Sequence, residues 1–567
     1  MDVGTISLIL MVGLIVLLAI GMPLGFASAF MAVVVLFLKF EPAVIFDLTL
    51  WGEGFLTGRP GSGPLNILSQ RIYGDVMTSY VLISIPLFIF MAALLERSGV
   101  AKSMYDSLNV WLNRTRGGIA IVTSIMAVIM AAMSGIIGGE VVLLGLIALP
   151  QMLRLGYNQN LAIGTICASG SLGTMIPPSI VLIIYGLITE TSIKALFTAA
   201  FLPGFMLASF IIIYIIVRTQ LNPSHAPLPN ERIASDLAAA GDNVERRAEL
   251  EAELAEFEAQ PRGAEKLKLF CAFLCVLVVG FWSFFTIRVL FFEFTGQNAA
   301  QTGDPIRFGT MDYLPWFLGT IGVALALIFL VFGAMRTATG WRMGKGLVPP
   351  IIIIGVVLGS IYMGITGITE AAGMGALAVL VLATLRGEFS LDLLWDALMR
   401  TLKSTGTIIW VTIGAAALAG AYTLAGGPNY IANLIVGSDM PTMLVLLTMM
   451  LILLFMGAFM DWVGIVLLII PVFLPIVKRL PIEEIGYLGE LQPKYVAVWF
   501  GVLFCMNMQV SFLSPPFGPA AFYLKSVAPP HISLTDIFKG FLPFICIQLF
   551  ALSILLIWPP IVELLLP

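Results

Sequence analysis

Two carboxylates lie inside long apolar segments of the chain, each beside a glycine-rich interruption. Glu140 follows the sequence SGIIGG, and Asp461 ends the sequence GAFMD. A carboxylate inside a bilayer is costly unless it is paired or binds an ion. A glycine-rich interruption also frees backbone carbonyls and amides, which is tolerated only where they face protein, water or an ion. These residue types in these places indicate an ion or substrate site within a membrane.

A second kind of interruption follows each acidic segment. Pro177-Pro178 and Pro515-Pro516 must break their helices, because proline lacks the amide hydrogen and clashes with the preceding turn. Exposed carbonyls favour Na+, whereas the amino end of a half-helix favours an anion. Each break also carries hydroxyl groups: Ser169, Ser171, Thr174 and Ser179 in the first, and Ser511 and Ser514 in the second. We therefore favour a paired cation and substrate site over the alternative of two structural kinks.

Motifs for enzyme catalysis are scarce in the sequence. The two histidines, His225 and His531, fall in expected loops, and the five cysteines fall in apolar stretches away from other metal ligands. The sequence GWRMGKG lacks the spacing of a phosphate loop, and no nucleophile elbow is found. An intramembrane enzyme is thus disfavoured and no catalytic residue is expected. A purely structural membrane scaffold would leave two costly helix breaks unexplained.

Composition indicates an all-α polytopic membrane protein. Of 567 residues, 59% are hydrophobic and 11% are charged, whereas soluble proteins carry about 25% charged residues. The continuous apolar runs suffice for on the order of a dozen helical passes through the lipid bilayer. The first run, Ile6 to Leu38, is too long for a signal peptide and is expected to be a retained anchor. The net charge of −4 gives no reason to expect a nucleic-acid partner.

The sequence contains an internal duplication. Glu140 precedes Pro150 by ten residues, and Asp461 precedes Pro471 by ten. In each half a double proline follows, and then the sequence FLPG in the first half or FLPF in the second. Lysine and arginine flank the first acidic run at both ends, which places those ends in the cytoplasm. We expect inverted repeats, each with a re-entrant hairpin and a broken helix.

These features divide the chain into segments. A charged stretch, residues 219–268, is expected to be a cytoplasmic acidic linker helix, and a solvated linker is favoured over a docking element. The chain begins with an N-terminal scaffold helix and its connection (1–79), followed by a first repeat (80–218) that contains hairpin 117–154 and broken helix 160–190. The linker (219–268) and an inserted pair of transmembrane helices (269–335) come next. Scaffold and arm helices of the second repeat (336–440) precede a final segment (441–567), which contains hairpin 441–477, broken helix 495–526 and a C-terminal helix.

Several sequences resemble a known family. SGIIGGEVVLLGLIALPQMLRLGY, ASGSLGTMIPPSIVLIIYG, LFTAAFLPG, GITGITEAAGMG and LSPPFGPAAF are similar to the large membrane subunit (DctM-like) of tripartite ATP-independent periplasmic (TRAP) transporters. The resemblance covers about residues 80–218 and 345–560. It implies Na+-coupled uptake of a small organic anion across the bacterial inner membrane by an elevator mechanism. It also implies two partners: a small membrane subunit and a periplasmic substrate-binding protein that delivers a carboxylate, 2-oxo acid or sulfonate.

The resemblance also implies site residues. A first Na+ site would use Ser134, Gly135, Gly138, Ser169, Ser171, Gly173 and Pro177. A second would use Gly457, Asp461, Ser511, Ser514 and Pro515. Substrate would contact Glu140, Thr174, Ser179, Asp461 and Pro516.

Two features depart from the family pattern. Many relatives have smaller residues at the first hairpin tip, where this chain has Glu140, and the insertion from about 219 to 335 resembles a longer branch of the family. Glu370 sits at a turn, where an outward cap or a structural role is at least as plausible as a transport role. A stand-alone Na+/dicarboxylate symporter that needs no binding protein is the alternative function.

Overall fold

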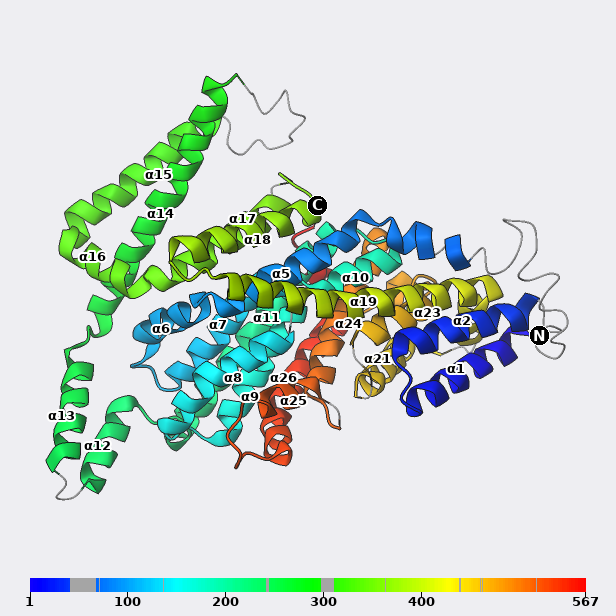
Figure 1. The fold of residues 1–567 in the computed structure, drawn as a ribbon, viewed down its shortest axis with the longest axis horizontal. Coiled ribbons are helices and arrows are strands. Elements are labelled where there is room, and N and C mark those ends of the chain that lie inside the picture. Colours follow the sequence, from blue (N-terminus) through cyan, green and yellow to red (C-terminus); the bar gives the residue numbers. More distant parts are fainter. Residues whose placement is uncertain are drawn as a thin grey trace.

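The described part of the chain is built from helices. The computed structural model describes residues 1–40, 68–70, 72–135, 137–240, 244–296, 311–362, 364–437, 440–458, 460, 462–516 and 518–566. Within these ranges there is no strand, and eight helical spans are long and apolar enough to cross a membrane. Shorter apolar helices form the arms of hairpins and the halves of interrupted helices (Figure 1). The expected all-α polytopic membrane fold is confirmed.

The N-terminal apolar run is a pair of helices rather than one anchor. Helix α1 spans Val3–Ala19 and α2 spans Leu24–Phe40. The chain turns between them because Gly21 has a φ of 86° and the next turn contains Pro23. Helix α2 lies along α19, with Gly25 and Gly414 at the crossing: a Cβ on Gly414 would come within 2.1 Å of the Gly25 carbonyl oxygen.

The first half contains a hairpin and an interrupted helix. Helices α7 (Gly118–Ser134) and α8 (Ile137–Arg154) form the hairpin. The interrupted helix consists of α9 (Gln159–Gly170), a 3-10 turn η4 (Ser171–Thr174) and α10 (Ile180–Thr189), with the double proline between the last two. Helix α9 packs against both arms of the hairpin.

The second half contains the corresponding elements. Helix α21 (Thr442–Gly457) is the first arm of its hairpin, and the second arm is divided into α22 (Trp462–Leu468) and α23 (Ile470–Val477). The interrupted helix is α24 (Val496–Leu513) followed by α25 (Pro519–Lys525). Helix α24 is buried almost throughout its length, and α26 (Leu534–Ile557) packs against both α24 and α9.

Seven further helices of the described chain pack around these elements. They are α5 (Ser84–Arg97), α6 (Val100–Leu112), α11 (Ile193–Leu221), α17 (Val348–Tyr362), α18 (Ile368–Leu385), α19 (Leu391–Ala425) and α20 (Gly427–Val436). Two ion pairs join α5 to α19: Arg97 lies 2.5 Å from Asp396, and Arg400 lies 3.0 Å from Glu96. Helix α19 extends along the long axis of the molecule in Figure 1.

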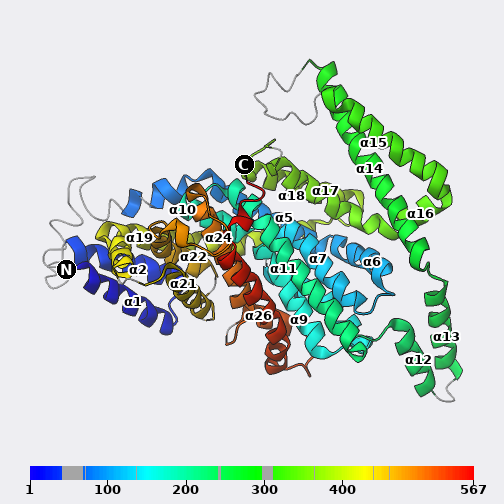
Figure 2. The ribbon, with the colours of Figure 1, turned by 180° about the vertical axis from the view of Figure 1, so that it is seen from behind.

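The insertion forms an arm that projects from the body (Figures 1 and 2). It comprises α14 (Gly263–Phe294), α15 (Leu314–Ala326), a π-helical turn η7 (Leu327–Phe332) and α16 (Gly333–Gly344). The inserted helices were predicted over residues 269–335, and in the structure they begin before residue 269 and end after residue 335. Few residues of α14 and α15 are buried, and many of the exposed ones are large and apolar, as expected for helices that face lipid.

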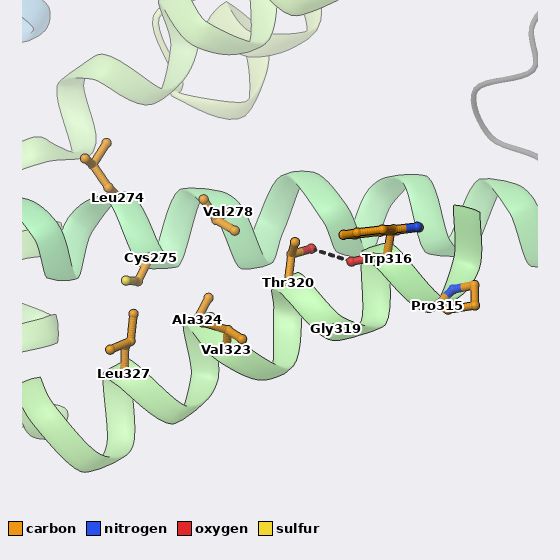
Figure 3. Close-up of a pocket in the computed structure, with 10 residues that line it drawn as sticks. All are labelled: Leu274, Cys275, Val278, Pro315, Trp316, Gly319, Thr320, Val323, Ala324 and Leu327. Carbon is orange, nitrogen blue, oxygen red and sulfur yellow. Dashed lines mark hydrogen bonds between the residues drawn. The ribbon is translucent and has the colours of Figure 1, made fainter. Parts of the chain in front are cut away.

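A groove between α14 and α15 has a volume of about 660 Å³ (Figure 3). Its lining is apolar and includes Leu274, Val278 and Trp316. The hydroxyl of Thr320 also lines the groove, but it donates to the Trp316 carbonyl of its own helix at 3.0 Å. The groove therefore offers apolar contact rather than polar recognition.

The charged linker contains two helices that dock on the body. Helix α12 spans Pro229–Ala239 and α13 spans Val244–Ala259. Arg114, in the loop before the first hairpin, donates to the carbonyls of Phe257, Glu258 and Gln260, the last two at 3.3 and 3.1 Å. The Phe257 and Glu258 carbonyls lie in the last turn of α13, where no following helical turn supplies amide partners, so a guanidinium satisfies them well. The Phe257 carbonyl also accepts from the Gln260 amide at 3.4 Å. One acidic linker helix was expected over residues 219–268, and a solvated linker was favoured over a docking element. The structure has two helices here, and loop arginines hold both of them against the body.

The second contact of the linker is an ion pair. Arg116 lies 2.6 Å from Glu231 of α12 and also donates to the Pro223 carbonyl at 3.1 Å. The hydrogen bond from Arg116 lowers the pKa of the Glu231 carboxyl. Because the folded pKa lies below the unfolded one, the pair stabilises the docked linker above about pH 4.3 and loses this contribution as the pH falls through the lowered value.

Arg114→Ala should loosen α13 while leaving the membrane helices in place. Hydrogen bonds to a charged group contribute about 1.5–3 kcal/mol, so losing the cap should speed amide hydrogen exchange at the end of α13 roughly tenfold or more. Arg262→Ala is the matched control, because the Arg262 guanidinium is exposed and reaches the Glu258 carbonyl only at 3.5 Å. Equal exchange in both variants would contradict a capping role for Arg114.

Candidate functional site

The tip of the first hairpin lies on the first double-proline break. Helix α7 ends because Gly135 adopts a left-handed conformation with a φ of 62°, and its amide donates to the Ala131 carbonyl at 3.3 Å. A Cβ on Gly135 would lie 2.1 Å from the carbonyl oxygen of Pro178. Both prolines of this break are buried. The glycine therefore permits a direct backbone contact between the hairpin tip and the interrupted helix.

Glu140 points from the hairpin into this junction. Its side chain is 1% exposed, and the hydroxyl of Ser134 donates to its Oε1. A Cβ on Gly173, in the turn between α9 and α10, would lie 3.0 Å from Oε2. No described residue hydrogen-bonds to Oε2. A buried carboxylate with an open lone pair requires a compensating cation or proton, so this is the strongest candidate for an ion-binding group among the described residues.

The hydroxyls near the break mainly organise its backbone. Ser179 caps α10: its hydroxyl accepts from the Leu182 amide at 3.4 Å and donates to the Thr174 carbonyl at 2.5 Å. The Thr174 hydroxyl donates to the Ser171 carbonyl at 3.1 Å and accepts from the amide of Gln509. Thr174 and Ser179 therefore lie together at the break, bonded to its backbone.

Ser169 lies away from the hairpin tip. Its hydroxyl is 2.9 Å from that of Ser124 on α7. Ser124 precedes Ser134 by ten residues, which corresponds to about 15 Å along a helix. The structure therefore does not bring Ser169 together with the tip.

Two more of the expected first-site residues face other neighbours. The Ser171 hydroxyl donates to the Ala168 carbonyl at 2.9 Å and accepts from Gln548 of α26 at 3.4 Å. Gly138 faces the ring of Tyr523, which a Cβ would approach to 3.0 Å. Of the seven residues expected at this site, Ser134, Gly135 and Gly173 meet at the junction, and Pro177 lies buried in the break.

The second hairpin meets its own interrupted helix. Helix α21 ends at Gly457, where a Cβ would lie 2.2 Å from the hydroxyl oxygen of Ser511. The Ser511 hydroxyl donates to the Asn507 carbonyl at 3.3 Å, and the Asn507 amide donates to the Met450 carbonyl on α21 at 2.9 Å. Gly457 and Ser511 are thus brought together as expected. Asp461 lies outside the described residues.

In the two junctions, the glycine and the larger polar residue that faces it come from opposite elements. Gly173 and Ser511 each stand four residues before the first proline of their pair. In the first half, Gly173 of the interrupted helix faces Glu140 of the hairpin. In the second half, Ser511 of the interrupted helix faces Gly457 of the hairpin. The glycine in each pair makes room for a polar side chain from the opposite element.

The two breaks also differ in exposure. The whole segment from Ser171 to Ile180 is buried, but Pro515 and Pro516 are exposed and Ser514 is partly exposed. The Ser514 hydroxyl donates to the carbonyl of Val510 at 2.8 Å, within its own helix. The first break is therefore closed and the second is open on one side.

Buried amides join the two halves. Gln509 of α24 donates to Thr174, and Gln548 of α26 donates to Ser171, so both second-half helices reach the first break. The side-chain oxygens of both glutamines are buried without a hydrogen-bond partner among the described residues. Sequence reasoning missed both residues, although a lone amide inside an apolar helix is a recognisable signal.

A cavity of about 360 Å³ lies between the hairpins and the surrounding helices. Gly135 and Thr174 of the first junction line it, together with Trp462 of the second hairpin. The first residues of α10 and four residues of α19 complete much of the wall; the polar ones on α19 are Ser404 and Thr407. No described lysine or arginine lines the cavity. An anion within it would need helix ends or a bound cation to offset its charge.

The first hairpin also contacts a charged side chain of α5. A Cβ on Gly139 would lie 1.6 Å from Oε1 of Glu96, which is paired with Arg400 of α19. Sequence reasoning missed Glu96, because its proximity to the hairpin depends on packing between distant segments. Glu370, by contrast, is exposed in the first turn of α18 and accepts a hydrogen bond from Tyr80 at 2.9 Å.

Comparisons with known proteins agree with this architecture. The family model "Tripartite ATP-independent periplasmic transporter, DctM component" matches residues 11–561. The C4-dicarboxylate TRAP transporter large permease protein DctM of Pseudomonas aeruginosa is 24% identical over 491 residues, which cover 86% of each chain. The ectoine/5-hydroxyectoine TRAP transporter large permease protein UehC of Ruegeria pomeroyi is 25% identical over 94% of this chain and 96% of that one.

A solved structure shares the fold. The crystal structure of the Alcanivorax borkumensis YdaH transporter matches with a TM-score of 0.51, covering 96% of this chain and 100% of that one. The two sequences are 15% identical, so this likeness concerns the fold alone.

Gly135→Ala should destabilise the first junction. The substitution places an alanine in a left-handed backbone conformation, which costs about 1–2 kcal/mol of folding free energy. The added Cβ also forces the hairpin tip away from the Pro178 carbonyl. Gly296→Ala is the control, because Gly296 has a similar φ of 66° with nothing within 4 Å of an added Cβ. Thermal unfolding in detergent should show a clearly lower Tm for Gly135→Ala than for the control. Equal Tm values would mean that the contact does not stabilise the fold.

Proposed function

This chain belongs to the DctM family of tripartite ATP-independent periplasmic (TRAP) transporters, and from this premise we propose that it is the large subunit of a Na+-coupled uptake system. It accepts a small organic anion from a periplasmic substrate-binding protein, works with a small membrane subunit, and resides in the bacterial inner membrane. The observation that carries the proposal is the buried junction at Glu140, where one carboxylate oxygen has no described partner, together with a cavity that Gly135 of the same hairpin tip and Thr174 of the same break line.

The first junction supplies ligands suited to Na+. Glu140 provides a carboxylate, Ser134 provides a hydroxyl, and the interrupted backbone provides carbonyls such as that of Pro178. A cation at Oε2 would neutralise the buried charge and hold the hairpin tip against the break. Asp461 is the acidic counterpart in the second half by its place in the repeat, and we assign it the same role at a second site with Gly457 and Ser511.

The cavity suits a small organic anion. Its volume of about 360 Å³ lies at the lower end of the range for small-molecule sites. Ile180 and Val181 begin α10 and line the cavity, so the positive end of this helix favours a negatively charged group. Ser404 and Thr407 of α19 also line the cavity; the Thr407 hydroxyl donates to the Lys403 carbonyl at 3.0 Å, so it offers the substrate an acceptor. The related permeases are named for different substrates, so the cavity supports only a class: a small carboxylate or sulfonate.

Coupling follows from the shared construction of the two sites. Thr174 and Gly135 border both the Glu140 junction and the cavity, so a cation that orders the junction also shapes the anion site. Cation binding offsets the charge of the anion in a cavity that no described lysine or arginine lines. In an elevator, the hairpins and interrupted helices would carry both ligands past α5 and α19, which supply the other cavity wall.

The function is tested by transport in vesicles. The chain, its small membrane subunit and the binding protein are reconstituted together, and uptake of a labelled organic acid is followed with and without an inward Na+ gradient. We expect accumulation only with the Na+ gradient and the binding protein. Uptake that ignores the Na+ gradient would overturn Na+ coupling, and full uptake without the binding protein would favour a stand-alone symporter.

Glu140→Gln should reduce Na+-driven uptake by at least tenfold, because an amide keeps the shape of the side chain but provides no charge for the cation. Glu370→Gln is the matched control, since Glu370 is an exposed carboxylate at a helix start. Both variants should insert and elute as wild type in gel filtration. Normal Na+-dependent uptake by Glu140→Gln would remove Glu140 from the cation site.

A further inference from the structure

A second polar cavity lies at the foot of the projecting arm. Its volume is about 720 Å³, and residues of α6, α16, the 3-10 turn η8 (Lys345–Leu347) and the turn after α18 line it. Three basic side chains line it: Arg342, Lys345 and Arg386. The acidic side chains in the lining are Asp106 and Glu388.

One wall of the cavity is held firmly in place. Arg386 pairs with Glu388 at 2.9 Å and donates to the Ser103 hydroxyl of α6 at 2.7 Å. The Gly346 amide donates to the Ser107 hydroxyl at 3.2 Å, and a Cβ on Gly346 would lie 2.1 Å from the Ser103 carbonyl oxygen. The cavity is therefore a built feature of the contact between α6 and η8.

The remaining two cations are free to bind an external anion. Arg342 and Lys345 are exposed and form no ion pair in the described part of the chain. The one hydrogen bond described for the Arg342 guanidinium is a long one, 3.5 Å, to the Thr339 hydroxyl. A guanidinium and an ammonium in one cavity lining are the two groups that proteins use to bind phosphate.

The position of the cavity indicates the source of the phosphate. Helices α14 and α15 expose apolar surface suited to lipid, and Trp341, 38% exposed, stands beside Arg342 as aromatic residues do at a membrane interface. Arg342 and Lys345 also belong to the basic helix ends that the positive-inside rule places in the cytoplasm. We propose that this cavity binds the phosphate headgroup of an anionic phospholipid of the cytoplasmic leaflet, with its acyl chains against the arm.

This site is distinct from the transport site and does not rest on the proposed function. Arg342 and Lys345 hold the phosphate, while Val110 and Met343 contact the glycerol and the start of the acyl chains. Asp106 is exposed in the same lining and opposes binding by repulsion. The proposal therefore predicts effects of both signs from single charge changes.

The test measures lipid binding by the purified, delipidated protein in neutral detergent. Native mass spectrometry follows a titration with phosphatidylglycerol and, separately, with zwitterionic phosphatidylcholine. Phosphatidylglycerol should bind at least fivefold more tightly. Arg342→Gln and Lys345→Gln should each weaken phosphatidylglycerol binding about fivefold, the effect of about 1 kcal/mol per basic residue near an anionic lipid, and Asp106→Asn should strengthen it.

Arg336→Gln provides the matched control, because Arg336 is exposed on the same helix but does not line the cavity. Its phosphatidylglycerol affinity should stay within twofold of wild type. Equal weakening by Arg336→Gln would overturn the site in favour of general charge attraction. Equal affinity for the two lipids would also overturn it, as would displacement of phosphatidylglycerol by millimolar inorganic phosphate, which would make the cavity a site for a soluble anion.

Discussion

The structure depends on how backbone groups are satisfied where membrane helices stop inside the protein. Lipid offers no hydrogen bonds, so each interrupted helix must find partners in another part of the chain. Here the tip of each hairpin fits against the interrupted helix of its own half: Gly135 lies on the Pro178 carbonyl, and Gly457 lies on Ser511. Amides from α24 and α26 complete the first break. The same contacts that satisfy the backbone also gather oxygen ligands around Glu140.

The two halves solve this problem with different residues. A buried carboxylate faces a glycine in the first junction, whereas a serine faces a glycine in the second. The first break is closed by helices from both halves, while the second has exposed prolines. An internal duplication can therefore preserve the positions of the breaks while the side chains at each junction diverge. Residues of both halves and of α19 line the cavity, so a substrate bound there would contact all three.

The features outside the duplication connect to the membrane and to the first hairpin. The linker helices reach the loop that starts this hairpin through Arg114 and Arg116. The arm that follows the linker exposes apolar helices, and its base contributes basic side chains to a cavity with α6. The insertion is therefore anchored at the basic ends of the helices, beside the entrance of the first hairpin.

The sequence alone predicted the membrane fold, the two hairpins and the two double-proline breaks, because apolar run length, glycine and proline act locally on the backbone. It also singled out Glu140, since a carboxylate in an apolar run is conspicuous. It could not show that Gly21 and Pro23 divide the first run, or that Arg114 caps the linker. Only the tertiary structure decided that Ser169 lies away from the tip, that Gln509 and Glu96 approach the first junction, and that Ser404 and Thr407 line the cavity. Those contacts join different helices, in the case of Gln509 and Thr174 335 residues apart in the chain, and their pairing depends on how helices pack rather than on any pattern along the chain.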